Sequence, residues 1–116
     1  MVLTGCPFLS YTEISEINAI LGDRKIAAGT KFWIQTSRIM YDLARRTGLA
    51  AELESKGITF IKDTCLNVCD VDKDWGFETI ATNSGKIAQY VTGLAGAHVA
   101  VMSTDECIDA AVKGAW

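Results

Sequence analysis

Short apolar runs alternate along this chain with segments of helical periodicity, and this alternation constrains the fold more than any other feature. Four runs have the length and character of buried strands: Lys31 to Gln35, Ile58 to Ile61, Phe77 to Ala81 and Ala97 to Met102. Strands that alternate with helices generally pair in parallel, with the crossover helices on the faces of the sheet. We therefore expect an α/β fold of three layers (αβα) with a mainly parallel four-stranded sheet, in a single domain over residues 1–116.

The expected helices begin at hydroxyl residues and end at glycines. The first is capped by Ser10 or Thr12, and Glu13 completes a capping box with Ser10. The others are expected from Thr36 or Ser37 to Gly57 with an interruption at Gly48, from Lys86 to Leu94, and from a cap at Thr104.

Polar residues follow the expected strands at the points where ligands bind in parallel sheets. Ligands of such folds gather at the carboxyl ends of the strands, where helix N-termini offer main-chain N–H groups to anions. The candidate ligands of a carboxylate or phosphate are Thr36, Ser37, Arg38, Asn83, Ser84 and Lys86. The alternative for each turn is that its hydroxyl and amide residues act as helix caps and that its cation is solvated. The presence of two such turns on one sheet edge favours an anion site.

The four cysteines differ in their surroundings. Cys6 stands in a stiff Gly-Cys-Pro turn before the first helix, where a thiolate is stabilised and suits a metal. Cys65 follows a strand directly, and Cys69 forms a CxxxC pair with it that is typical of either redox or metal chemistry. Cys107 is expected in the core. The single histidine, His98, is expected inside a strand as a structural residue with a satisfied ring.

Charge and hydropathy exclude several classes of partner. The net charge is −3, and the eleven lysines and arginines form no stripe, so nucleic acid is not an expected partner. No stretch approaches the roughly 18 apolar residues of a membrane span. The first ten residues lack the basic and apolar regions of a signal peptide, so we expect a reducing cytoplasm in which the thiols stay unpaired.

Taken in order, these segments resemble the aconitase X family of iron-dependent hydro-lyases. The resemblance runs along most of the chain. It rests on GCP at 5–7, TSR at 36–38, DTC at 63–65, TNSGK at 82–86, YxxGLxG at 90–96 and a final helix that contains DEC and closes with AAVKG. In that family the matching region is the C-terminal part of a much longer catalytic domain.

The resemblance implies a dehydratase that acts on a small hydroxy acid such as cis-3-hydroxy-L-proline, or alternatively on mevalonate 5-phosphate. It implies that Cys6 and Cys65 ligate iron or an iron–sulfur cluster, with a third cysteine from outside this chain. Iron would polarise the leaving hydroxyl, and the catalytic base would also lie outside. The implied partners are the remaining catalytic domain and a swivelling domain or small subunit. The chain alone is expected to be inactive.

Two other classes of function remain open on the sequence. A non-catalytic anion-binding α/β module would account for the two hydroxyl-rich turns but not for Cys6. A thiol redox domain would use Cys65 and Cys69, although CxxxC is not the usual spacing of such sites.

Overall fold

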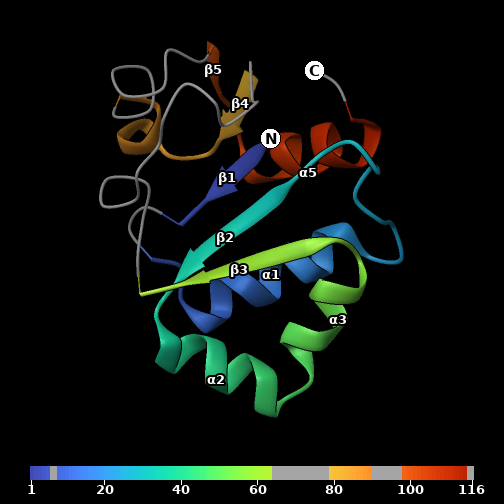
Figure 1. Ribbon diagram of the computed structural model, residues 1–116, viewed down its shortest axis with the longest axis vertical. Coiled ribbons are helices and arrows are strands. Elements are labelled where there is room, and N and C mark those ends of the chain that lie inside the picture. The colour runs from blue at the N-terminus through green and yellow to red at the C-terminus, as the bar shows by residue number, and fades with distance from the viewer. Residues whose placement is uncertain (6–7, 64–78, 90–97, 115–116) are drawn as a thin grey trace.

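The computed structural model describes residues 1–5, 8–63, 79–89 and 98–114, and the remaining positions are not discussed in structural terms. Within these ranges the chain folds into strands that alternate with helices (Figure 1). In chain order the elements are β1 (Val2–Thr4), α1 (Tyr11–Leu21), β2 (Phe32–Thr36), α2 (Arg38–Arg46), α3 (Leu49–Ser55), β3 (Ile58–Lys62), β4 (Thr79–Thr82), β5 (His98–Val101) and α5 (Thr104–Lys113). Residues 85–89 form a further helical segment.

Within the described residues the sheet has five strands in the order β3-β2-β1-β4-β5, and every pairing is parallel. The expected α/β class and parallel sheet are confirmed, but the expected number of four strands is wrong. The strand that the sequence did not reveal is β1, which lies in the centre between β2 and β4 (Figure 1). Three residues are too few to show any periodicity, so β1 is specified by its neighbours: Val2 pairs with both Phe32 and Ala81.

Two helices begin at capping boxes, as the hydroxyl residues before them favour. Ser10 Oγ accepts a hydrogen bond from the Glu13 N–H at 3.3 Å, and Glu13 Oε1 accepts one from the Ser10 N–H at 3.2 Å. At α5 the cap is Ser103, which pairs reciprocally with Glu106, and not Thr104 as expected. The last strand ends earlier than the sequence suggested, so the preceding serine takes the capping position.

The helical region after β2 consists of two helices. Ser37 caps α2, and Gly48 separates α2 from α3 with φ of 84°, a left-handed conformation that favours glycine. The interruption expected at this glycine is therefore confirmed, and it lets Leu49 and Leu53 of α3 turn inward onto the sheet.

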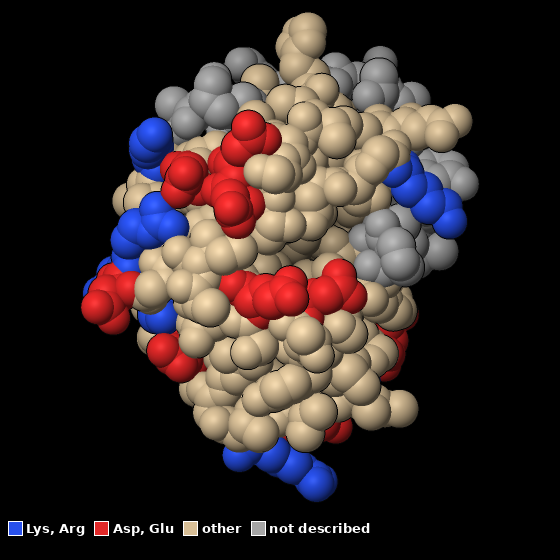
Figure 2. Space-filling view, turned by 180° about the vertical axis from the view of Figure 1, so that it is seen from behind, with Lys and Arg blue, Asp and Glu red and all other residues tan. Residues whose placement is uncertain are grey.

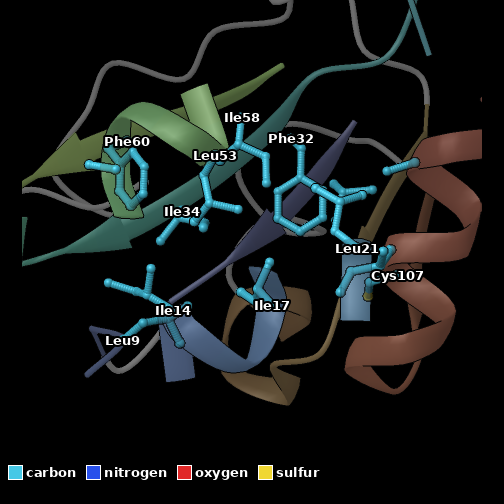
Figure 3. Packing of buried hydrophobic residues seen from close by; sticks show 14 of the residues in the cluster. Leu9, Ile14, Ile17, Leu21, Phe32, Ile34, Leu53, Ile58, Phe60 and Cys107 are labelled. Atoms are coloured by element: carbon cyan, nitrogen blue, oxygen red, sulfur yellow. The ribbon is translucent and has the colours of Figure 1, made fainter. Parts of the chain in front are cut away.

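The main hydrophobic core lies between one face of the sheet and α1, α2, α3 and α5. Figure 3 shows its side chains converging from both layers, among them Phe32 and Ile34 of β2 and Ile14 and Ile17 of α1. Each fully buried aliphatic or aromatic side chain of this kind stabilises the fold by roughly 1.5–3 kcal/mol.

The opposite face of the sheet is also covered. Leu3 and Ile80 are fully buried but lie outside the main cluster, because alternate residues of a strand point to opposite faces. Ile87, from the helical segment 85–89, is likewise buried outside that cluster. Both faces are thus packed, as a three-layer arrangement requires.

The expectation about His98 is wrong. His98 is the first residue of the edge strand β5 and is exposed, so it is not the enclosed structural residue that the apolar run suggested.

Among the described residues, no helix combines the length and the apolar character needed to cross a bilayer.

Candidate functional site

The carboxyl edge of the sheet gathers the candidate residues. Because all pairings are parallel, the ends of β1, β2 and β4 lie on the same edge, with β1 in the middle. Three buried threonines mark these ends: Thr4, Thr36 and Thr82. The two turns predicted to bind an anion, 36–38 and 83–86, therefore follow strands that flank β1 on either side.

The first of these turns holds an anion that belongs to the chain itself. Asp63 Oδ1 accepts a hydrogen bond from the main-chain N–H of Arg38 at 2.8 Å, at the N-terminus of α2. The Arg38 Nε lies 3.9 Å from Asp63 Oδ2. The hydroxyl of Ser37 accepts from the Met40 N–H, and that of Thr36 donates to the Leu9 carbonyl at 2.7 Å inside the core. What this turn presents outward is the Arg38 side chain, which is 62% exposed.

Asp63 adopts a backbone conformation that is uncommon for a side-chain-bearing residue. Its φ is 58°, in the left-handed region where aspartate and asparagine are tolerated better than most residues. The Asp63 N–H donates to the Thr36 carbonyl at 3.0 Å, so its main chain is tied to the end of β2 and its side chain to the start of α2. Neither this carboxylate nor its link to Arg38 was predicted from the sequence. The only signal was an acidic residue directly after a strand.

The second turn contains a cap and an exposed cation. The Ser84 hydroxyl accepts from the Ile87 N–H at 3.2 Å, and the Ser84 N–H donates to Thr82 Oγ1 at 3.1 Å. Asn83 Nδ2 donates to Thr104 Oγ1 at 3.0 Å, which links this turn to the start of α5. Lys86 is exposed. The hydroxyls of Ser37 and Ser84 thus serve as helix caps, and the two cations reach solvent.

Gly5 and Gln35 meet at the ends of the two central strands. A Cβ on Gly5 would lie 2.2 Å from the Gln35 carbonyl oxygen, and Gly5 has φ of 108°, so only glycine fits this close approach of two main chains. Gln35 is 1% exposed, and neither the nitrogen nor the oxygen of its side-chain amide has a hydrogen-bond partner in the part of the chain described. The sequence signal for Gln35 was a polar residue at the end of an apolar run.

The predicted metal ligands Cys6 and Cys65, and also Cys69, lie outside the described residues. Among residues 1–5, 8–63, 79–89 and 98–114, no group of three histidine, cysteine, aspartate or glutamate side chains is arranged to hold a metal ion. Cys107 is fully buried in the main core, as expected, and burial raises the pKa of its thiol to about 11.

The outer surface of the helices is mixed in charge. Figure 2 shows acidic side chains in two groups on the face seen from behind, with lysines and arginines toward its margins. Exposed acidic residues come from both α1 and α5: Glu13, Glu16, Asp105, Glu106 and Asp109. Arg24 bridges to Asp109 at 2.7 Å and ties the end of α1 to α5. A shallow hollow of about 350 Å³ lies on the outer side of α2, lined by Ile39, Asp42, Leu43 and Arg46.

The sheet is parallel and packed on both faces, and helix caps, cations and an unpaired amide lie along its carboxyl edge. These features define the class of open α/β domains, whose ligands generally bind at that edge. Residues 1–113 match the family described as the aconitase X third domain. This chain belongs to the aconitase X family.

Relatives in two groups of dehydratases are similar along most of the chain. The phosphomevalonate dehydratase large subunit of Methanocaldococcus jannaschii is 35% identical over 91 residues, which is 78% of this chain and 22% of that protein. The cis-3-hydroxy-L-proline dehydratase of Pseudomonas aeruginosa is 32% identical over 117 residues, covering 98% and 20% respectively.

The fold agrees with a solved structure of the family. The crystal structure of Thermococcus kodakaraensis aconitase X in its holo-form superposes with a TM-score of 0.85 at 32% identity, and the match covers 96% of this chain and 28% of that one. The chain therefore spans about a fifth to somewhat more than a quarter of the length of these relatives.

Proposed function

We propose that this chain is the third-domain part of an iron-dependent hydro-lyase that removes water from a small hydroxy acid such as cis-3-hydroxy-L-proline. The observation that carries the proposal is the match over residues 1–113 to a family whose curated relatives are dehydratases. A segment of a mevalonate 5-phosphate dehydratase is the second candidate, supported by the similarity to phosphomevalonate dehydratase large subunits.

In the proposed reaction a carbon–oxygen bond and the carbon–hydrogen bond on the neighbouring carbon break, a carbon–carbon double bond forms, and water leaves. Cys6 and Cys65 are the proposed ligands of an iron ion or iron–sulfur cluster, together with a third cysteine from outside this chain. Such a centre supplies a Lewis acid for the leaving hydroxyl. The base that removes the proton is expected outside this chain as well.

The described neighbours of the two cysteines support a shared site. Gly5 follows the last residue of β1, and Asp63 follows the last residue of β3. Both therefore lie at the carboxyl edge of the sheet. Neighbouring strands lie about 4.8 Å apart, so β1 and β3, with only β2 between them, are about 10 Å apart. β1 leads to Gly5, the residue that precedes Cys6 in the sequence, at this edge of the sheet.

The proposed substrate ligands are the residues of the two turns: Thr36, Ser37, Arg38, Asn83, Ser84 and Lys86. The hydroxyls of the first turn and of Ser84 have partners within the chain, so the substrate contacts expected to matter most are those of Arg38 and Lys86, whose side chains are exposed. Two cations that flank the central strand suit the carboxylate or phosphate of a hydroxy acid.

The proposed partners are the rest of the catalytic domain and a swivelling domain or small subunit, because this chain spans only part of its relatives. The proposed location is the cytoplasm, whose reducing conditions keep thiol ligands available for a metal. Without these partners we expect the chain to bind iron weakly and to show no dehydratase activity.

The test is assembly of the chain with the remaining domains, followed by anaerobic reconstitution with iron and assay of water loss. We expect turnover of cis-3-hydroxy-L-proline and none by the isolated chain. Turnover of mevalonate 5-phosphate alone would favour the second candidate. An assembled, iron-loaded protein that dehydrates neither compound would contradict the lyase assignment. Binding of phosphate or a hydroxy acid without turnover would then favour a non-catalytic anion-binding module.

A further inference from the structure

Gln35 differs from the other buried polar residues at the carboxyl edge. Four polar residues in the described part of the chain are buried: Thr4, Gln35, Thr36 and Thr82. Each threonine hydroxyl has a partner: Thr4 donates to the Trp33 carbonyl, Thr36 donates to the Leu9 carbonyl, and Thr82 accepts from the Ser84 N–H. Only the amide of Gln35 has neither its nitrogen nor its oxygen paired within the described residues.

An unpaired buried amide lowers the stability of a fold, because it has lost its hydrogen bonds to water and gained none in return. Leucine is an apolar side chain of similar volume and would occupy this position without that cost. Functional sites are where such locally unfavourable residues are retained. The amide therefore calls for a partner that the described residues do not supply.

The position of Gln35 points to a ligand as that partner. It is the last but one residue of β2, so its side chain projects near the carboxyl edge. Phe32 and Ile34 face the main core, and Gln35 faces the opposite side of the sheet because residues alternate along a strand. Its main chain packs directly against Gly5, the residue before the proposed metal ligand Cys6. Gln35 thus lies at the carboxyl edge, with its main chain against Gly5 and its side chain on the face of the sheet away from the main core.

We propose that Gln35 binds the substrate of this site, with Nε2 donating to the carboxylate and Oε1 accepting from the hydroxyl. This inference rests on the proposed function. An amide offers N–H donors and a carbonyl acceptor, and a hydroxy acid offers a carboxylate acceptor and a hydroxyl donor. One small ligand of this class satisfies both unpaired atoms, which neither a simple anion nor an apolar ligand does. Gln35 is then a substrate-binding and orienting residue rather than the base.

The first part of the test measures the stability of the 116-residue chain without substrate. Gln35→Leu removes both unpaired atoms at nearly constant volume, so its melting temperature should equal or exceed that of the wild type. Thr36→Val is the matched contrast, because it removes a buried hydroxyl that has a partner at 2.7 Å, and it should lower the melting temperature. A clear drop in melting temperature for Gln35→Leu would assign the amide a structural role and overturn the proposal.

The second part measures the assembled, iron-loaded enzyme. A hydrogen bond to a charged group is worth a factor of roughly 10 to 100 in binding. We expect Gln35→Leu to lower kcat/KM for the hydroxy acid by that factor, with unchanged iron content. Gln35→Glu should be worse, because a carboxylate repels the substrate carboxylate. If both variants keep kcat/KM within twofold of the wild type, the Gln35 inference alone fails. If the wild type turns over no hydroxy acid, the proposed function fails, and the inference fails with it.

Discussion

The carboxylate of Asp63 binds the N-terminus of helix α2 by accepting the Arg38 N–H at 2.8 Å. The two residues stand 25 positions apart and belong to two different segments of the family resemblance, TSR and DTC. The structure joins these segments into one unit. Through Asp63, the turn after β2 is held against the end of β3, the strand that precedes Cys65 in the sequence.

Replacing Asp63 should separate the contribution of its hydrogen bond from that of its backbone conformation. Asp63→Gly keeps the positive φ but loses the bond, and should lower the free energy of unfolding by about 1 kcal/mol. Asp63→Ala loses both and should cost about 1 kcal/mol more, whereas Asp63→Asn should stay within about 0.5 kcal/mol of the wild type. Urea unfolding measures the series, with Asp23→Ala, an exposed residue after α1, as control. Equal stability of the glycine and alanine variants would show that the backbone conformation contributes nothing.

Gly5→Ala should be strongly destabilising. The added Cβ would lie 2.2 Å from the Gln35 carbonyl oxygen at a φ of 108°, so β1 and β2 must move apart at the centre of the sheet. The expected loss is about 2–5 kcal/mol, large enough to unfold a domain of this size. Gly29→Ala is the matched control, since its Cβ would meet nothing within 4 Å, and its melting temperature should be unchanged. A Gly5→Ala protein as stable as that control would contradict the close approach.

Cys65 and Cys107 should differ sharply in the assembled enzyme. Cys65→Ser removes a proposed iron ligand and should abolish both iron binding and turnover. Cys107 is buried in the main core and is not a proposed iron ligand. Cys107→Ser should therefore leave iron binding and turnover nearly intact. Iron content and the rate of water loss measure the effect. A Cys65→Ser enzyme that keeps its iron and its rate would remove this cysteine from the proposed site.

The stability contributed by Cys107 should decline at high pH. Burial, and secondarily the charge of Glu106, raises the pKa of this thiol from 9.0 to about 11. Between these values the unfolded chain loses its thiol proton while the folded chain keeps it, so stability falls as pH rises from 9 through about 11. The difference in unfolding free energy between the wild type and Cys107→Ala should therefore be constant below pH 9 and shrink above it. A difference that stays constant to pH 11 would show that the thiol is not buried in solution.

Arg38→Ala and Lys86→Ala should each raise KM for the hydroxy acid about tenfold, because each removes a charge from the proposed substrate site. The melting temperature should change little, since both side chains are exposed. Lys113→Ala is the control: this exposed lysine ends α5, a helix that begins at the carboxyl edge and runs away from it. Equal KM values for all three variants would place the anion elsewhere.

The sequence by itself determined the class of fold and the family. Apolar runs that alternate with helical periodicity predict a parallel α/β sheet because burial on two faces and crossover helices are local consequences of those patterns. Caps such as Ser10 and Ser37, and the break at Gly48, were likewise predictable, since each depends on residues within one turn of helix.

Only the tertiary structure decided how the edge of the sheet is built. Three residues become the central strand because Phe32 and Ala81 flank them from distant parts of the chain. Asp63 contacts Arg38 of α2 across 25 positions of sequence, and Gly5 contacts Gln35 across 30. Neither contact produces a periodic pattern of residues that could be recognised in the sequence. Such pairings depend on strand order and register, which are set by packing of the whole domain and not by local preference.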